Sequence, residues 1–263
     1  KIVLVTPKAK NDWEVKTLVD LPFVHRFDIL TSGGVNYLIA CALKSGHEYK
    51  EDWSMPGKVY AAVLPEDLEG FDEDHQLELT VLKDQMLKNH GYYKVKKDGV
   101  DTCLISCDEG VFRFTPPEGP EGDWKIEELV SEAASDAVLV DLDGDGKEEL
   151  ALISPFHGEH IYIYRETEEG YQKVYSYDTA EFAHAIYGGS LLGRPAVIIG
   201  HRKGERNLLL FTWDQDKGDF RADVLDRDCG PANVLKYLRD GEEVLISTNR
   251  EIDEVAMYTF EEE

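Results

Sequence analysis

The sequence reads Asp141-Leu142-Asp143-Gly144-Asp145-Gly146-Lys147-Glu148-Glu149-Leu150 between two apolar runs, residues 137–140 and 150–153. Two short apolar runs on either side of a compact segment rich in Asp and Gly predict two antiparallel strands joined by a tight turn. The three aspartates alternate, and the glycines stand where the backbone must turn, so the three carboxylates are expected to surround one point. This acidic turn serves as the reference for aligning the rest of the chain.

Two interpretations of the acidic turn are open. Ca²⁺ prefers oxygen ligands, and Asp141, Asp143, Asp145 and Glu149, together with the Lys147 carbonyl, would supply a shell of them. Hydrogen bonds to the turn's own backbone would equally hold the carboxylates without a cation. The turn resembles the Asp-x-Asp-Gly-Asp-Gly turn of the FG-GAP and VCBS repeat families, which build β-propellers. The resemblance implies a β-propeller here.

Short β-rich runs recur along the whole chain at a period of about 45 to 50 residues, with turn signals between them. This period is typical of propeller blades, each of which is too small to bury both of its faces alone. We therefore expect an all-β fold, a β-propeller of four-stranded antiparallel blades, in a single domain of residues 1–263. The predicted blades span about residues 24–86, 87–133, 134–180, 181–230 and 231–263, the last completed by residues 1–23.

The two ends of the chain determine the predicted number of blades. Residues 2–7 and 12–16 resemble residues 111–116 and 123–127, which form the outer half of a predicted blade. The C-terminal segment supplies inner strands, so strands from both ends are expected to complete one blade and close the ring without a free edge. This arrangement gives five blades. The ends together offer one strand more than a four-stranded blade needs, so six blades is the alternative.

Charge and cysteine content indicate the partners and the compartment. The formal net charge of −25 argues against nucleic acid, whose phosphates require clustered Lys and Arg. It would also repel anionic membranes, and no apolar run approaches the roughly 18 residues of a membrane span. Cys41, Cys103, Cys107 and Cys229 are predicted to be reduced structural thiols, which favours the cytoplasm over secretion. The sequence does not predict the oligomeric state.

Polar residues recur at the predicted blade starts, and on a propeller these positions share one face. In register they are His25, His90, Asp136, His184 and Asn233. Loops that end on the same face add further candidates, among them His157, His160, His201, Arg202 and Arg250. Imidazoles with a carboxylate suit Zn²⁺, Mn²⁺ or Fe²⁺, and imidazoles also act as acids and bases near neutral pH. The predicted ligands of a transition metal at the channel mouth are His25, His90, Asp136, His157, His184 and His201.

A second resemblance concerns the long insertion in the first predicted blade, which contains Glu51-Asp52-Trp53-x-x-Pro56-Gly57-x-Val59-Tyr60. With a blade-start histidine, it resembles the propeller part of aldos-2-ulose dehydratase-type proteins, which dehydrate and isomerise keto-sugars with metal ions. The resemblance implies a carbohydrate-active, metal-dependent lyase, dehydratase or isomerase acting on a small molecule or oligosaccharide. The predicted catalytic residues are His25, His90, His184 and His201, with Arg202 and Arg250 holding an acid group of the substrate.

Two other functions are open. A non-catalytic propeller that binds carbohydrate or protein would repeat shallow, aromatic-floored pockets between blades, but the loops of the predicted blades differ from one another. A structural propeller would use its inner polar residues only to bind each other and channel water. The chain has no Gly-x-Ser-x-Gly elbow, Walker loop or Rossmann fingerprint, so nothing supports serine nucleophiles or nucleotide binding.

Overall fold

The computed structural model describes residues 1–97 and 99–260. The chain separates into two compact units, Lys1–Ser131 and Glu132–Glu263, here called unit 1 and unit 2. Strands make up nearly all of the regular structure in the described residues, and all strand pairs in both units are antiparallel. No helix among these residues has the length and apolar character that crossing a membrane requires.

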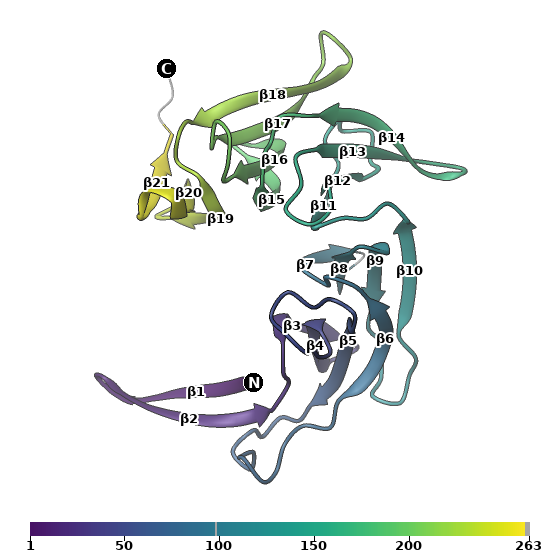
Figure 1. The fold of residues 1–263 in the computed structure, drawn as a ribbon, viewed down its shortest axis with the longest axis vertical. Helices are drawn as coiled ribbons and strands as arrows, with labels where there is room; N and C mark the ends of the chain where they lie inside the picture. Colours follow the sequence, from purple (N-terminus) through teal and green to yellow (C-terminus); the bar gives the residue numbers. More distant parts are fainter. Residues whose placement is uncertain (98, 261–263) are drawn as a thin grey trace. The chain divides into compact units, whose positions relative to one another are not determined.

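Unit 1 contains one two-stranded and two four-stranded sheets (Figure 1). The first pairs β1 (Ile2–Ala9) with β2 (Asp12–Val19). The second follows chain order through β3 (Val24–Ser32), β4 (Val35–Lys44), β5 (Pro56–Leu64) and β6 (Thr80–Met86). The third does the same through β7 (Gly91–Lys97), β8 (Val100–Cys107), β9 (Gly110–Thr115) and β10 (Lys125–Val130).

Unit 2 contains two four-stranded sheets and one three-stranded sheet (Figure 1). The first consists of β11 (Asp136–Val140), β12 (Glu149–Ile153), β13 (Ile161–Thr167) and β14 (Gly170–Tyr177). The second consists of β15 (Ala183–Leu191), β16 (Arg194–His201), β17 (Leu208–Asp214) and β18 (Asp219–Asp226). The third consists of β19 (Pro231–Arg239), β20 (Glu242–Asn249) and β21 (Glu254–Thr259), with a 3-10 turn, η1 (Arg250–Ile252), before β21.

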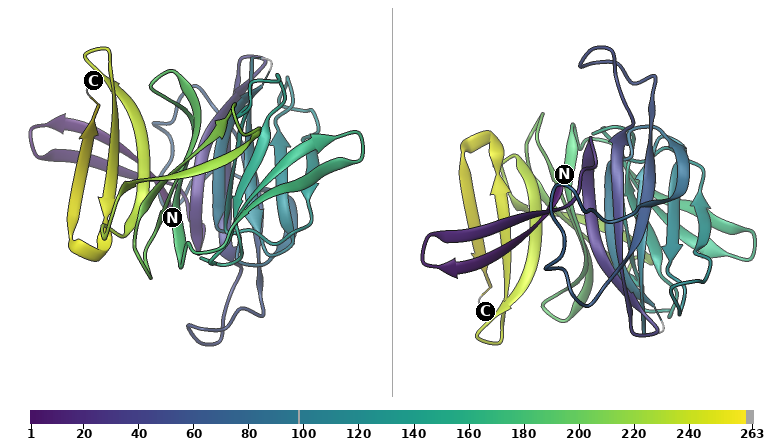
Figure 2. Two further views of the ribbon diagram at one scale, coloured as in Figure 1. Left: turned by 90° about the horizontal axis from the view of Figure 1, so that it is seen from above. Right: turned by 90° about the horizontal axis from the view of Figure 1, so that it is seen from below.

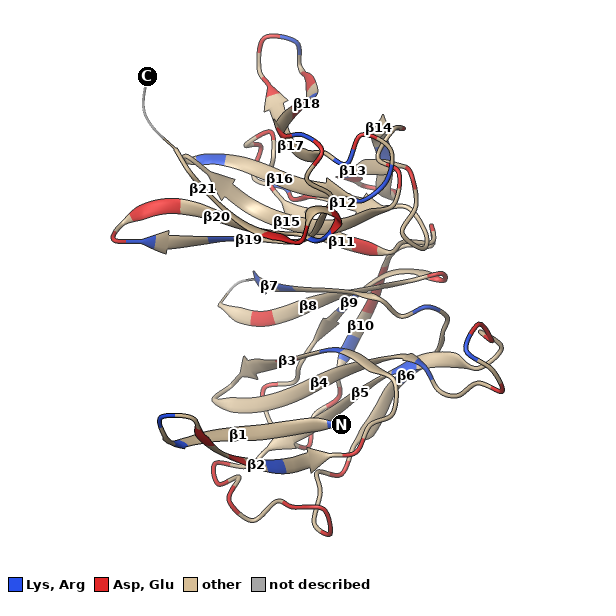
Figure 3. Cartoon of the chain, turned by 60° about the vertical axis from the view of Figure 1, so that its left-hand side comes forward, with Lys and Arg blue, Asp and Glu red and all other residues tan. Residues whose placement is uncertain are grey.

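Burial differs along each four-stranded sheet in a way that the sequence explains. The second strands β4, β8, β12 and β16 contain apolar runs, and their central residues are buried on both faces. Outer strands such as β14 alternate between exposed and half-buried residues. A strand buried on both faces requires another layer against each face, whereas alternation suits a strand with one solvated face. Many of the charged residues lie on the turns between strands (Figure 3).

The prediction of five blades closed by strands from both ends is wrong. Six sheets form in the described residues, because β1 and β2 pair with each other while β19, β20 and β21 make a separate sheet. The buried residues Ile2, Leu18 and Val19 of the β1–β2 hairpin pack against Leu38 and Ala40 of β4. This apolar contact fixes the hairpin within unit 1, and its tip points away from the β3–β6 sheet (Figure 2). The alternative of six agrees with the number of sheets, while the single-domain assignment stays a prediction.

Gly57 on β5 is expected to be intolerant of any side chain. A Cβ atom at this position would lie 2.0 Å from the Ala42 carbonyl oxygen and 2.9 Å from that of Met86, both backbone atoms that cannot move aside cheaply. Gly57→Ala should therefore lower the free energy of unfolding by about 2–3 kcal/mol, as overpacking in a buried sheet does. Gly70→Ala is the control, since nothing lies within 4 Å of its added Cβ. Equal urea midpoints for the two variants would contradict this packing.

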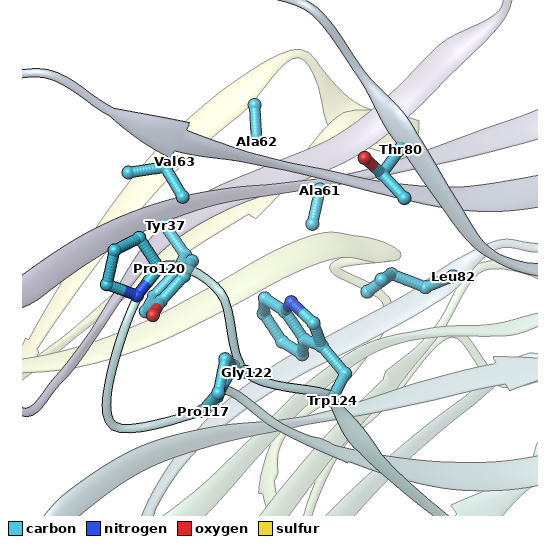
Figure 4. A pocket seen from close by; sticks show the side chains of 10 residues that line it. All are labelled: Tyr37, Ala61, Ala62, Val63, Thr80, Leu82, Pro117, Pro120, Gly122 and Trp124. Atoms are coloured by element: carbon cyan, nitrogen blue, oxygen red, sulfur yellow. The ribbon is translucent and has the colours of Figure 1, made fainter.

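A cavity of about 130 Å³ in unit 1 lies between the β3–β6 sheet and the turn before β10 (Figure 4). Its aromatic walls are Tyr37 and Trp124, whose rings meet edge-to-face with centroids 5.5 Å apart. The buried Tyr37 hydroxyl has no hydrogen-bond partner among the described residues, and burial raises its pKa. None of the predicted site residues lines this cavity.

Candidate functional site

A one-residue bulge near the start of β3, β15 and β19 determines which side chains these strands present. The pairing register skips His25 in β3, His184 in β15 and Ala232 in β19. A bulge turns the extra residue out of the ordinary alternation, and bulges are frequent beside active sites. His25 and His184 therefore occupy equivalent positions in their sheets. In β19 the equivalent residue is Ala232, one position before the Asn233 of the sequence alignment.

His157 and His184 form the centre of an aromatic cluster in unit 2. Their rings are stacked, with centroids 4.8 Å apart and planes 17° apart. His157 also stacks on Phe182 at 4.7 Å and contacts Phe156 at 4.3 Å. One ring nitrogen of His157 and one of His184 lie within 4.8 Å of each other. The two imidazoles thus present nitrogen atoms to a common small volume.

The hydrogen bond of His184 fixes its tautomer. Its Nδ1 lies 2.7 Å from the carbonyl oxygen of Ala232, which can only accept. In the neutral ring Nδ1 therefore carries the proton, and Nε2 has the lone pair. Histidines that bind metal typically make this kind of bond to a backbone carbonyl, because it orients the ring and raises its basicity.

The backbone beside this pair is strained. His157 and Phe182 both have a φ of 58°, a left-handed conformation that bulky residues rarely adopt. Such strain costs on the order of 1–3 kcal/mol for each residue, and it concentrates where function requires a particular geometry. The loop is held by backbone bonds, including Ala183 N–H to the Gly158 carbonyl at 3.0 Å. The strain is thus stabilised by the surrounding structure.

Arg202 extends the cluster through a contact with Phe182. Its guanidinium carbon lies 4.9 Å from the centre of the Phe182 ring. Its Nε and Nη2 atoms donate to one oxygen of Glu251 at 2.8 and 2.7 Å, which lowers the pKa of that carboxyl. Arg202 is therefore close to the histidine pair, but its charge is already matched by Glu251.

The sequence did not point to Phe182, although a repeated pattern could have. Phe182-Ala183-His184 has the same form as Phe23-Val24-His25, and Phe23 also has a positive φ, of 59°. A bulky residue two positions before each bulged histidine is thus a feature of both units. In unit 1, Phe23 contacts the ring of His47 at 5.2 Å.

Unit 1 carries a second pair of predicted ligands. The rings of His25 and His90 have centroids 4.6 Å apart and planes 37° apart. His90 is buried, and its backbone N–H donates to the Ser106 carbonyl at 3.2 Å, while His25 is exposed. The prediction that histidines from several blades line one channel mouth stays a prediction.

His201 was predicted to bind metal, but its contacts favour a structural role. Its Nδ1 donates to the Lys203 carbonyl at 2.9 Å, and its Nε2 accepts from the backbone N–H of Asn207 at 3.0 Å. Both ring nitrogens are therefore used by the loop between β16 and β17. Burial lowers the pKa of this nearly inaccessible side chain, which keeps it neutral.

The remaining predicted residues of unit 2 lie in other surroundings. Asp136 is buried, and its carboxylate accepts the backbone N–H of Ala137 at 3.0 Å. Arg250 is exposed in the 3-10 turn η1. His160 has its Nδ1 3.1 Å from a carboxylate oxygen of Asp178 at an exposed position. We do not include these residues in the candidate site.

The acidic turn folds as the expected link between β11 and β12, with Val140 paired to Glu149. Asp141, Asp143 and Glu149 bring oxygens within 4.8 Å of one another, whereas Asp145 lies outside this group. Backbone N–H groups already bind two of these carboxylates. Asp141 accepts hydrogen bonds from the N–H groups of Gly144 and Gly146 at 2.9 and 3.1 Å, and Glu149 accepts one from that of Leu142 at 2.8 Å.

Arg165 on β13 is the residue that sequence reasoning missed at this turn. Its Nη2 donates to Asp143 and its Nε donates to Glu149 at 3.3 Å. The pairing of Leu150 with Tyr164 places Arg165 beside Glu149, so the cross-strand register was the signal. A guanidinium thus supplies positive charge to two of the three carboxylates, which favours the interpretation without a cation.

No protein-family model and no curated protein matches this sequence. Solved structures do resemble it. The periplasmic gluconolactonase of Pseudomonas aeruginosa is 14% identical, with a TM-score of 0.54 over 86% of this chain and 63% of that one. A 6-phosphogluconolactonase-like protein of Bacteroides fragilis, whose function is described as putative, is 12% identical, with a TM-score of 0.53 over 88% of this chain and 65% of that one.

The fold is propeller-like. At these identities the likeness concerns the fold alone. The chain spans slightly less than two thirds of the length of both lactonase structures. The all-β class and the antiparallel four-stranded sheets predicted from the sequence are confirmed.

Proposed function

We propose that this chain is a carbohydrate-active enzyme in which His157 and His184 bind a divalent transition metal. The observation that carries the proposal is the stacked imidazole pair, whose ring nitrogens lie within 4.8 Å of each other. The Nδ1 bond of His184 to a backbone carbonyl gives that ring the tautomer that a metal ligand needs. The strain at His157 supports a functional reason for its position.

The imidazole groups of His157 and His184 are of a ligand type that such a metal prefers. Neutral imidazoles suit Zn²⁺, Mn²⁺ and Fe²⁺. Two metal–nitrogen bonds of about 2.1 Å require ligand nitrogens no more than about 4.2 Å apart, and the two histidine nitrogens lie within 4.8 Å of each other. Catalytic zinc sites commonly have three protein ligands. The sequence supplies further candidates in His25 and His90, which we retain as predicted ligands.

The chain's own residues suggest how such a site would work. A bound divalent cation supplies a Lewis acid that polarises a sugar carbonyl or carboxylate oxygen. An imidazole outside the metal shell can accept the neighbouring proton, because its ordinary pKa is close to neutral. Phe156 and Phe182 both pack against the His157 ring, and apolar groups beside a site strengthen the electrostatic interactions there.

The substrate class rests on two lines of support. The two similar structures are those of a gluconolactonase and of a protein named as a putative 6-phosphogluconolactonase, and both names refer to sugar-derived lactones. The second resemblance of the sequence implies keto-sugar dehydration or isomerisation. We therefore propose a lyase, dehydratase or isomerase reaction on a sugar acid or keto-sugar.

A panel assay of the full chain tests this proposal. The protein would be stripped with chelator, reloaded with Zn²⁺, Mn²⁺ or Fe²⁺, and offered aldonolactones, uronates and keto-sugars. Elimination and lactone opening are followed at 235 nm and by pH indicator, and isomerisation by NMR. We expect turnover of at least one class that requires metal. Metal-independent turnover would overturn the proposed role of the metal. Sugar binding without turnover would overturn the enzyme proposal and favour a binding propeller.

A further inference from the structure

A second cavity, of about 500 Å³, lies in unit 2 at the acidic turn. Three connections between strands form it: the β11–β12 turn, the start of β16 after the β15–β16 turn, and the β17–β18 turn. Ligand pockets commonly have volumes of about 300–1,000 Å³. The cavity is therefore large enough for a sugar ring or a short oligosaccharide.

Trp213, at the end of β17, is the aromatic wall of this cavity. The indole is half-buried and packs edge-to-face on Phe220 with centroids 5.0 Å apart. The guanidinium carbon of Arg165 lies 5.3 Å from the centre of the Trp213 ring. The ring is thus held by two contacts before any ligand arrives, which reduces the entropy lost on binding.

The acidic turn gives this wall its rigidity. Glu149 has a fully buried side chain and, with Asp143, holds Arg165 against the indole. The Gln215 amide also donates to the Asp143 carbonyl at 3.5 Å, joining the β17–β18 turn to the acidic turn. The carboxylates that the sequence suggested for a cation instead orient an arginine and, through it, a tryptophan.

The charges around the cavity are mixed and largely matched. Asp143 is paired with Arg165, Asp214 with Lys217 and with backbone N–H groups, and Arg221 with Asp223. The exposed Arg194 adds a donor at the rim, and the exposed Asp216 adds an acceptor. Neither sign of charge dominates, so the site disfavours strongly ionic ligands. Hydroxyl groups, which both donate and accept, suit such a lining.

We infer that this cavity binds a ring of a neutral carbohydrate, stacked on Trp213 and hydrogen-bonded by the charged rim. The site is separate from the histidine pair. His157 follows β12 and His184 begins β15, whereas the cavity forms where β12 begins and β15 ends. A strand places its two ends apart, so the inference does not depend on the metal proposal.

Calorimetry and tryptophan fluorescence with neutral hexasaccharides test the inference. The probes are cellohexaose, xylohexaose, mannohexaose and laminarihexaose, with trigalacturonate as the acidic comparator. We expect at least one neutral probe to bind with a dissociation constant on the order of 0.1–1 mM. Trp213→Ala should weaken binding at least about tenfold, because the stacking surface is lost. Trp13→Ala is the matched control, since Trp13 is 58% exposed on β2 of unit 1 and outside the cavity.

Arg194→Ala tests the same cavity in case Trp213→Ala misfolds, because replacing an exposed arginine changes stability little. It should weaken binding about 3- to 10-fold, the loss of one charged donor. His184→Ala should bind the same hexasaccharide normally. The inference is overturned if no neutral probe binds up to about 10 mM, or if trigalacturonate binds more tightly than every neutral probe. It is also overturned if Trp213→Ala and Arg194→Ala both bind as well as wild type, or if His184→Ala abolishes binding.

Discussion

Replacing His184 with alanine is expected to weaken transition-metal binding by at least about 100-fold and to abolish metal-dependent turnover. The variant removes one of two converging imidazoles, and with it the hydrogen bond that His184 Nδ1 donates to the Ala232 carbonyl oxygen. His184→Asn would keep a donor toward the Ala232 carbonyl but lack the second imidazole nitrogen. It therefore separates the loss of the metal-binding nitrogen from the loss of the hydrogen bond. Competition with a chromogenic chelator gives the affinities of both variants.

His160→Ala is the matched control for the histidine pair. His160 belongs to the same loop as His157, but its side chain is 43% exposed and pairs with Asp178. Its removal should leave the metal affinity unchanged. Equal losses in His160→Ala and His184→Ala would mean that the loop, and not the imidazole pair, determines metal binding.

The second large effect is expected for stability. Arg165→Met should lower the free energy of unfolding by roughly 2–4 kcal/mol, because it leaves Glu149, whose side chain is fully buried, without its cation. It also removes the stacking on Trp213 and Phe220. Arg206→Met is the control, since the Arg206–Asp228 pair is exposed and should contribute little. Urea denaturation gives both values.

The effect of Arg165→Met should depend on pH. Burial raises the pKa of Glu149 above its usual value, and Arg165 acts against that shift. Removing Arg165 therefore raises the pKa of Glu149 further. An acid with a raised folded pKa favours folding when protonated, so its contribution falls as pH rises through that pKa. The loss caused by Arg165→Met should be larger at pH 7 than near pH 4.5, and a loss independent of pH would contradict the role of Glu149.

The sequence was sufficient for local structure where its pattern was strong. The acidic turn and its flanking apolar runs predicted the strands β11 and β12 and the turn between them, and the structure pairs Val140 with Glu149. The number of sheets was not predictable in the same way. The β1–β2 hairpin could complete another sheet or pack on β4, and only tertiary contacts of Ile2 and Leu18 decide between them.

The candidate site was predicted in part. Repeated spacing identified His25 and His184, whose equivalent bulges the structure then revealed. His201 was predicted from a loop after a second strand and lies at the end of β16, but its two backbone hydrogen bonds depend on the path of the following loop. Arg165 is 16 residues from Glu149 and becomes its neighbour only through strand pairing. A sequence motif identifies residue types, whereas contacts such as the one between Arg165 and Glu149 can be predicted only when the pairing register of the strands is known.

X-ray absorption spectroscopy of the zinc-loaded protein tests the central claim most directly, since it reports the atoms bound to the metal. We expect one zinc per chain, a first shell with imidazole nitrogens at about 2.0–2.1 Å, and loss of these imidazole signals in the His157→Ala/His184→Ala double variant. A protein that binds no stoichiometric zinc, or a first shell of oxygen alone that the double variant leaves unchanged, would contradict the claim that this histidine pair is a metal site.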